Sequence, residues 1–183
     1  MSFPILTILA LLPLVGGAII LGVKGRSGRA TGLVISTVTA VLGVIAFIAA
    51  ANGTDVSENY HWIKAIGAWY ALSSDGLGMT LVLMTVVLVP VVLLAEWDIG
   101  EKEPSDGPQT WGANVFSGLA LMTEGLAIYC FTAVDVLFFY LIFEASLVPM
   151  YFLISGWGGE RRRRAAIKFL IYSLAGGLVM LFG

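Results

Sequence analysis

One carboxyl group stands out because of its position in the sequence. Glu144 is the only charged residue in a strongly apolar run over 136–159. Such a run can cross a bilayer, since about 20 helical residues at about 1.5 Å each span a hydrocarbon core about 30 Å thick. A charge at mid-membrane costs from about 2.5 to above 10 kcal/mol, so acids kept there usually face a protein interior or a water-filled cavity. We therefore predict that Glu144 is the main functional residue and that it serves ion or proton movement.

A second carboxyl group lies in the preceding apolar segment. Glu124 belongs to 112–131, which only four residues separate from 136–155, so the two segments must form an antiparallel hairpin. Helical rise then places Glu124 and Glu144 roughly 13 to 15 Å from the same membrane surface. The spacing fixes their depth but not the direction in which each one faces. Glu124 therefore remains a candidate either for proton transfer or for hydrogen bonding between helices.

The segment around Glu144 carries other polar groups. Four of its residues share one helical face: Tyr140, Glu144, Tyr151 and Ser155. Pro149 cannot donate a hydrogen bond to the carbonyl of Ala145, and the free acceptor favours local hydration. A cation that approaches a buried carboxyl stabilises its charged form, and withdrawal of that cation favours the protonated form. The stripe thus has the elements of a proton-loading site.

The basic residues cluster beside the last apolar segment. Arginines occupy all of 161–164, and Lys168 follows one helical turn later. Such a run is typical of a topology anchor or of contact with lipid headgroups. Lys168 either extends to the membrane interface or points inward as part of a proton-entry path.

The elements that must position these residues are membrane-spanning helices. Hydrophobic residues make up 58% of the 183-residue chain and charged residues 12%, against about 25% charged in soluble domains. We predict an all-α, polytopic transmembrane bundle, because spans of this length are helices rather than barrel strands. Six spans are expected, the last one incomplete: 1–24, 31–51, 76–95, 112–131, 136–155 and 165–183.

The loops between these spans indicate an orientation. If the N-terminus is outside, the loops 24–29, 96–110 and 156–164 are cytoplasmic and hold eight basic residues, whereas the outside loops hold only Lys64. This asymmetry follows the positive-inside rule. The aromatic-rich outside loop 52–75 is predicted to be an interfacial segment.

Redox cofactors and nucleic acid have no support in the sequence. The single cysteine, Cys130, has no partner for a disulfide or an iron–sulfur site. The single histidine, His61, lies in a polar loop, which excludes a bis-histidine haem within the membrane part of this segment. No metal site is expected.

Several short motifs are characteristic of one family. They are FFYLIFE at 138–144, PMY at 149–151, GWGG at 156–159, RAA at 164–166, and KF at 168–169 with Tyr172, preceded by DGL at 75–77 and AVDVL at 133–137. Together they resemble the antiporter-like subunit M of bacterial respiratory complex I, the NADH dehydrogenase subunit 4 family. The resemblance covers most of the chain and is most specific over 137–172.

This resemblance implies a subunit of about fourteen transmembrane helices in the proton-pumping arm of NADH:quinone oxidoreductase, a translocase of the respiratory chain. Residues 1–183 would form a single transmembrane domain, the N-terminal part of that subunit, in the bacterial plasma membrane. The chain itself would bind no cofactor, whereas the whole complex implies FMN, iron–sulfur clusters, NADH and quinone. Expected partners are membrane lipids and the other membrane-arm subunits, including other antiporter-like ones.

The resemblance also suggests roles for individual residues. Glu144 matches the family's fifth-helix glutamate, one end of a glutamate–lysine pair in a proton half-channel. Lys168 matches a lysine common in the family. The partner lysine on the seventh helix, the central lysine on the eighth and the exit-side acid on the twelfth would all follow Gly183.

Two other hypotheses remain. A subunit of a multisubunit cation/proton antiporter would share the same module and the same glutamate, but would exchange sodium for protons without NADH. A purely structural membrane scaffold would use both glutamates only to tie helices together, and Glu144→Gln would then preserve activity.

Overall fold

The computed structural model describes residues 4–22, 27–63, 68–97 and 111–182. Six helices in this part are long and apolar enough to cross a membrane. They are α1 (Ile5–Gly22), α2 (Ser27–Ala51), α3 (Gly76–Ala95), α4 (Ala113–Thr132), α5 (Val136–Trp157) and α6 (Arg162–Phe182). The predicted helical transmembrane fold is confirmed, and each predicted span matches one helix to within a few residues at either end.

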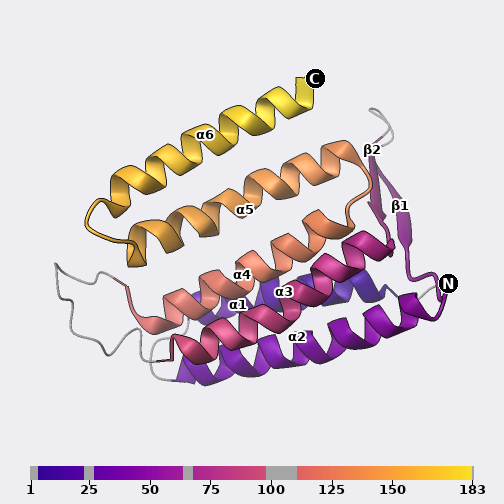
Figure 1. The fold of residues 1–183 in the computed structure, drawn as a ribbon, viewed down its shortest axis with the longest axis horizontal. Helices are drawn as coiled ribbons and strands as arrows, with labels where there is room; N and C mark the ends of the chain where they lie inside the picture. The colour runs from indigo at the N-terminus through magenta and orange to yellow at the C-terminus, as the bar shows by residue number, and fades with distance from the viewer. Residues whose placement is uncertain (1–3, 23–26, 64–67, 98–110, 183) are drawn as a thin grey trace.

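The helices lie side by side, with α2 on one flank and α6 on the other (Figure 1). From α6 inward, α5 packs on α6 and α4 packs on α5, while α1, α2 and α3 all contact α4. As the sequence predicted, α4 and α5 form an antiparallel pair, joined at the end of the molecule where both chain ends lie. We call this the hairpin end, and the opposite end, where α5 turns into α6, the basic end.

Two short strands at the hairpin end were not predicted. Strands β1 (Glu58–Ile63) and β2 (Ala68–Leu72) pair antiparallel, with Tyr60 opposite Tyr70. They occupy the aromatic-rich loop that the sequence suggested to be interfacial. Their pairing satisfies backbone groups that a plain loop would leave to solvent.

Helices α1 and α4 approach each other through small residues. A side chain on Gly17 would place its Cβ 2.5 Å from the carbonyl oxygen of Gly118, and one on Gly125 would lie 2.5 Å from the carbonyl oxygen of Ala10. Small residues allow such close backbone contact between membrane helices, where packing rather than hydrophobic burial drives association. This contact fixes the rotation of α4 and therefore the direction in which Glu124 points.

The start of α5 is held by Asp135. Its carboxylate accepts hydrogen bonds from the backbone amides of Phe138 at 2.9 Å and of Trp69, in β2, at 3.1 Å. The bond from Phe138, an N-cap contact, contributes most to keeping the pKa of Asp135 below its usual value. Asp135 thus links the strand pair to the helix that carries Glu144.

Candidate functional site

The carboxyl group of Glu144 faces α6. Its Oε1 atom is buried and has no hydrogen-bond partner in the described part of the chain. A Cβ built on Gly177 of α6 would lie 2.6 Å from this oxygen and 3.4 Å from Cε2 of Tyr140. Helix α6 therefore passes directly over the carboxyl, and a side chain at position 177 would force the carboxyl to shift.

The rest of the predicted polar stripe also faces α6. Tyr151 and Ser155 line a cavity of about 230 Å³ together with Arg162 and Arg163, which lie at the start of α6. The stripe thus runs from Tyr140 and Glu144, under Gly177, toward the arginines at the basic end. This geometry agrees with the shared face that the sequence spacing predicted.

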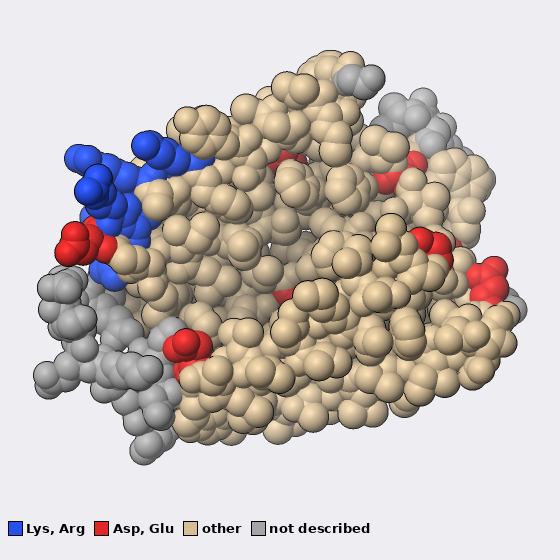
Figure 2. Space-filling model, viewed as in Figure 1, with Lys and Arg blue, Asp and Glu red and all other residues tan. Residues whose placement is uncertain are grey.

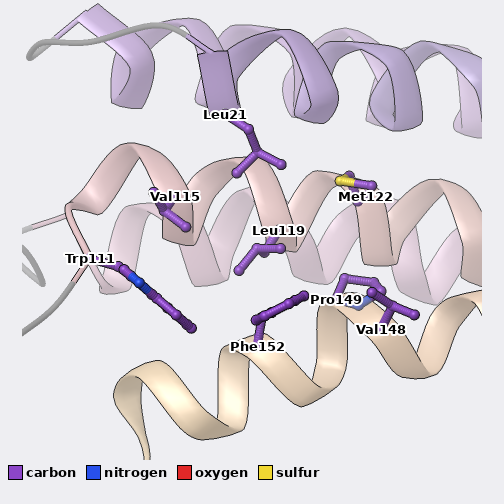
Figure 3. A pocket seen from close by; sticks show the side chains of 8 residues that line it. All are labelled: Leu21, Trp111, Val115, Leu119, Met122, Val148, Pro149 and Phe152. Atoms are coloured by element: carbon purple, nitrogen blue, oxygen red, sulfur yellow. The ribbon is translucent and has the colours of Figure 1, made fainter.

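Pro149 lies on a different side of α5. It is buried and lines a cavity of about 300 Å³ between α1, α4 and α5 (Figure 3). All eight lining side chains are apolar or aromatic: Leu21, Trp111, Val115, Leu119, Met122, Val148, Pro149 and Phe152. The interruption at Pro149 therefore adjoins an apolar cavity, and this cavity gives no support to the predicted hydration beside Glu144.

Glu124 points away from Glu144. It is 1% exposed, and the hydroxyl of Ser36 on α2 donates a 3.4 Å hydrogen bond to its Oε2 atom. Its Oε1 atom is buried without a partner among the described residues. The two acids thus face opposite flanks of the α4–α5 pair, toward α2 and toward α6. The structure settles the direction that spacing alone left open, and it does not bring the two carboxyls together.

Lys168 is distant from Glu144 along α6. Nine residues separate it from Gly177, which corresponds to about 13 Å of helical rise. Its side chain is exposed, and within the described residues it forms no ion pair with Glu144. The described arginines and Lys168 gather at the basic end (Figure 2). The three candidate site residues therefore lie in different environments: Glu144 faces α6, Glu124 faces α2, and Lys168 is exposed toward the basic end.

Reasoning from sequence missed three residues that shape the surroundings of the acids or support the fold. Gly177 could have been noticed as half of a Gly–Gly pair in an apolar span, and Ser36 as a polar residue in another. No sequence pattern pointed to Glu58, because its hydrogen-bond partners lie in α1, more than 50 residues away in the sequence. It is 2% exposed and accepts hydrogen bonds from the amides of Leu6, at 2.8 Å, and Thr7, at 3.1 Å, at the start of α1.

The Glu58 contact extends into a polar network at the hairpin end. The Thr7 hydroxyl also bonds Glu58 and lies 2.6 Å from the Tyr70 hydroxyl, which in turn donates to the Tyr129 hydroxyl at 3.4 Å. Glu58 satisfies first-turn amides of α1 and is favoured there by the helix dipole. Its role is to tie β1 to α1. Among the described residues, no group of three or more His, Cys, Asp or Glu could hold a metal ion.

Comparison with known proteins shows which proteins this chain is similar to. Residues 133–183, which contain α5 and α6, match the family described as NADH:quinone oxidoreductase/Mrp antiporter, transmembrane. Subunit M of the NADH-quinone oxidoreductase of Mycobacterium tuberculosis is 38% identical over 98% of this chain and 37% of its own length. The chain is homologous to these antiporter-like subunits.

Other relatives of the antiporter-like subunits agree. Subunit M of the F(420)H(2) dehydrogenase of Methanosarcina mazei is 32% identical over 98% of this chain and 35% of its own length. Chain 4 of the NAD(P)H-quinone oxidoreductase of Synechococcus elongatus is 32% identical over 98% of this chain and 34% of its length. The chain therefore spans about a third of the length of the curated relatives it matches.

A solved structure has the same fold. A chain of respiratory complex I from Thermus thermophilus, determined with bound NADH, superimposes with a TM-score of 0.79 and 30% identity, over 96% of this chain and 34% of that one. The helices that carry Glu124 and Glu144 thus have the arrangement found in a chain of respiratory complex I.

Proposed function

We propose that this chain is part of a proton-translocating antiporter-like subunit in the membrane arm of an NADH:quinone oxidoreductase, and that Glu144 takes up and releases the transferred proton. The observation that carries the proposal is the Glu144 carboxyl under Gly177, with a buried oxygen turned toward α6 and the Tyr140 side chain beside the carboxyl. Glu124 also has a buried unbonded oxygen, so the proposal selects Glu144 by its surroundings: the polar face that continues through Tyr151 and Ser155 toward the arginines.

The mechanism uses electrostatics alone. A cationic side chain that approaches Glu144 stabilises the carboxylate, and its withdrawal lets the carboxyl take a proton. Tyr151, Ser155 and the arginine-lined cavity provide polar groups on the same face toward the basic end. In this proposal the chain itself holds no redox cofactor, and flavin, iron–sulfur clusters, NADH and quinone act elsewhere in the complex.

The names of the relatives support a role remote from electron input. Their names contain three different electron donors, NADH, NAD(P)H and F(420)H(2), yet all match nearly this whole chain at 32–38% identity. A segment that contacted the electron donor would have to differ among them. A proton-transfer module driven from a distance fits all three.

The proposal includes topology and partners. Residues 1–183 would form a single transmembrane helical domain, the N-terminal part of a longer subunit, in a bacterial plasma membrane. The N-terminus and the hairpin end would lie outside, because the described arginines and Lys168 gather at the opposite end and positive charge favours the cytoplasmic side. Other membrane-arm subunits, including further antiporter-like ones, would surround it.

The direct test is Glu144→Gln in the full-length subunit within the assembled complex. We expect loss of NADH-driven proton pumping in vesicles, because an amide forms hydrogen bonds but does not change its charge by gaining or losing a proton near neutral pH. The matched control is Glu160→Gln, an exposed glutamate between α5 and α6. Normal pumping in the Glu144 variant, with full NADH:quinone activity, would reject the proposal and leave the scaffold hypothesis.

Two further variants test the tentative roles of Glu124 and Lys168. If Glu124→Gln or Lys168→Gln lowers pumping while assembly is normal, that residue belongs to the proton path. If pumping is unchanged, Glu124 serves only to bond Ser36 and Lys168 only to contact the interface. Sodium-dependent proton exchange without NADH, and no copurifying flavin or iron–sulfur proteins, would instead favour the antiporter hypothesis.

A further inference from the structure

Two adjacent cavities near the basic end differ sharply in chemistry. The apolar cavity of about 300 Å³ is formed by α1, α4 and α5, as Figure 3 shows. The second, of about 230 Å³, contains Tyr151, Ser155, Arg162 and Arg163 in its lining. Both are lined by Trp111 and Phe152. An apolar cavity therefore adjoins a basic and hydroxyl-bearing one at these two rings.

The position of the pair along α5 matches the layers of a membrane leaflet. Phe152 lies five residues and Val148 nine residues before Trp157, the last residue of α5. Helical rise places these side chains about 8 and 13 Å from the basic end, at the depth of acyl chains. Arg162 and Arg163 open the next helix, where phosphate groups of lipids lie. Trp111 is an aromatic residue at the boundary between the two layers.

We propose that the two cavities together bind one anionic phospholipid, with its phosphate at Arg162 and Arg163 and an acyl chain in the apolar cavity. The guanidinium of Arg162 donates one hydrogen bond to the carbonyl oxygen of Gly156, at 3.3 Å. A guanidinium has five N–H donors in a geometry suited to phosphate, so most remain for a headgroup. The hydroxyl of Tyr151 adds a further donor, whereas that of Ser155 already donates to the carbonyl oxygen of Phe152 at 3.2 Å.

Charge distinguishes this occupant from a neutral lipid or a free ion. Four arginines in succession attract an anionic headgroup, and the apolar cavity gives no contact to inorganic phosphate. A zwitterionic lipid would fill the apolar cavity equally well but would gain less from the arginines. Lipid binding does not require proton uptake by Glu144, although the basic cavity includes Tyr151 and Ser155 of the polar face that the proposed proton path uses.

The arginine run supplies a matched control. Arg162 and Arg163 line the basic cavity, whereas Arg161 and Arg164 line neither. The full-length protein, in its assembled complex, is reconstituted in phosphatidylcholine vesicles with phosphatidylglycerol that carries a photoreactive diazirine in one acyl chain. Labelled peptides are then mapped by mass spectrometry in the wild type, in Arg162→Gln/Arg163→Gln and in Arg161→Gln/Arg164→Gln. A Val148→Trp variant fills the apolar cavity from an exposed position.

We expect labelling of 111–122 and 148–152, stronger with phosphatidylglycerol than with photoreactive phosphatidylcholine and not displaced by inorganic phosphate. Removal of each arginine that contacts the phosphate should weaken labelling by phosphatidylglycerol about fivefold. The Arg162→Gln/Arg163→Gln variant should therefore lose about 25-fold, and the Arg161→Gln/Arg164→Gln variant should change little. Val148→Trp should lower acyl labelling. Equal labelling by both lipids, equal loss in both arginine pairs, or no labelling because protein fills the cavity would each overturn the proposal.

Discussion

The contact between Gly177 and Glu144 gives the most specific prediction. A Cβ at position 177 would lie 2.6 Å from Glu144 Oε1, well inside van der Waals contact. In Gly177→Ala the Glu144 carboxyl, the far end of a flexible side chain, must rotate away, which costs about 1 kcal/mol, the low end for overpacking. Because alanine favours a helix over glycine by about 1 kcal/mol, the net change in stability should be near zero. Proton pumping should nevertheless fall, because the carboxyl is displaced.

Gly176 is the matched control. A Cβ there meets nothing within 4 Å in the described part of the chain, so Gly176→Ala should gain the helix preference without disturbing Glu144. The assay compares thermal unfolding and proton pumping of both variants in the full-length subunit. Adding Glu144→Asp, whose side chain is one methylene shorter, should relieve the clash and show coupling in a double-mutant cycle. Equal effects of the two alanine variants on pumping would refute the reasoning.

Three other predictions concern the scaffold around the site. Glu58→Ala should destabilise the full-length protein by about 1 to 3 kcal/mol in denaturant titration, because it leaves amides at the start of α1 unbonded; unchanged stability would exclude the cap. Gly125→Ala should cost about 1 to 3 kcal/mol in thermal unfolding, since its Cβ would lie 2.5 Å from a carbonyl oxygen that cannot move away, whereas Gly22→Ala, with open space, should cost nothing. Asp135→Asn should keep the N-cap near neutral pH but remove its pH dependence. Because the pKa of Asp135 is lowered on folding, its ionic contribution is present above about pH 4 and is lost as the pH falls through the folded pKa; parallel pH profiles for variant and wild type would contradict this.

The helices could be predicted because long apolar runs report membrane crossing directly. The apolar stretches of α3 and α5 begin directly after the N-cap residues Asp75 and Asp135, so their boundaries were close to those observed. The β1–β2 strand pair was missed because 52–75 is short and rich in aromatics, a composition shared by interfacial loops and by strands. Pairing across it depends on the partner strand and on Glu58 reaching α1, which no local pattern reveals.

The site was predictable in part. Glu144 and its polar stripe followed from helical periodicity, and the depth of Glu124 followed from the short connection to α5. The rotation of each helix about its axis could not be predicted, because it depends on which small residues meet across an interface. Gly125 against α1 turns Glu124 toward Ser36, and Gly177 of α6 covers Glu144. These contacts join residues far apart in the sequence or on separate helices.

The central claim is that the Glu144 carboxyl gains and loses a proton during turnover. Infrared difference spectroscopy on the full-length subunit in its complex, with carbon-13-labelled glutamate, reports the carboxylic C=O stretch directly. We expect a band that changes when NADH is added with quinone, that shifts with the isotope and that is absent in Glu144→Gln but present in Glu160→Gln. A wild-type spectrum with no such band, in a complex that pumps normally, would contradict the account.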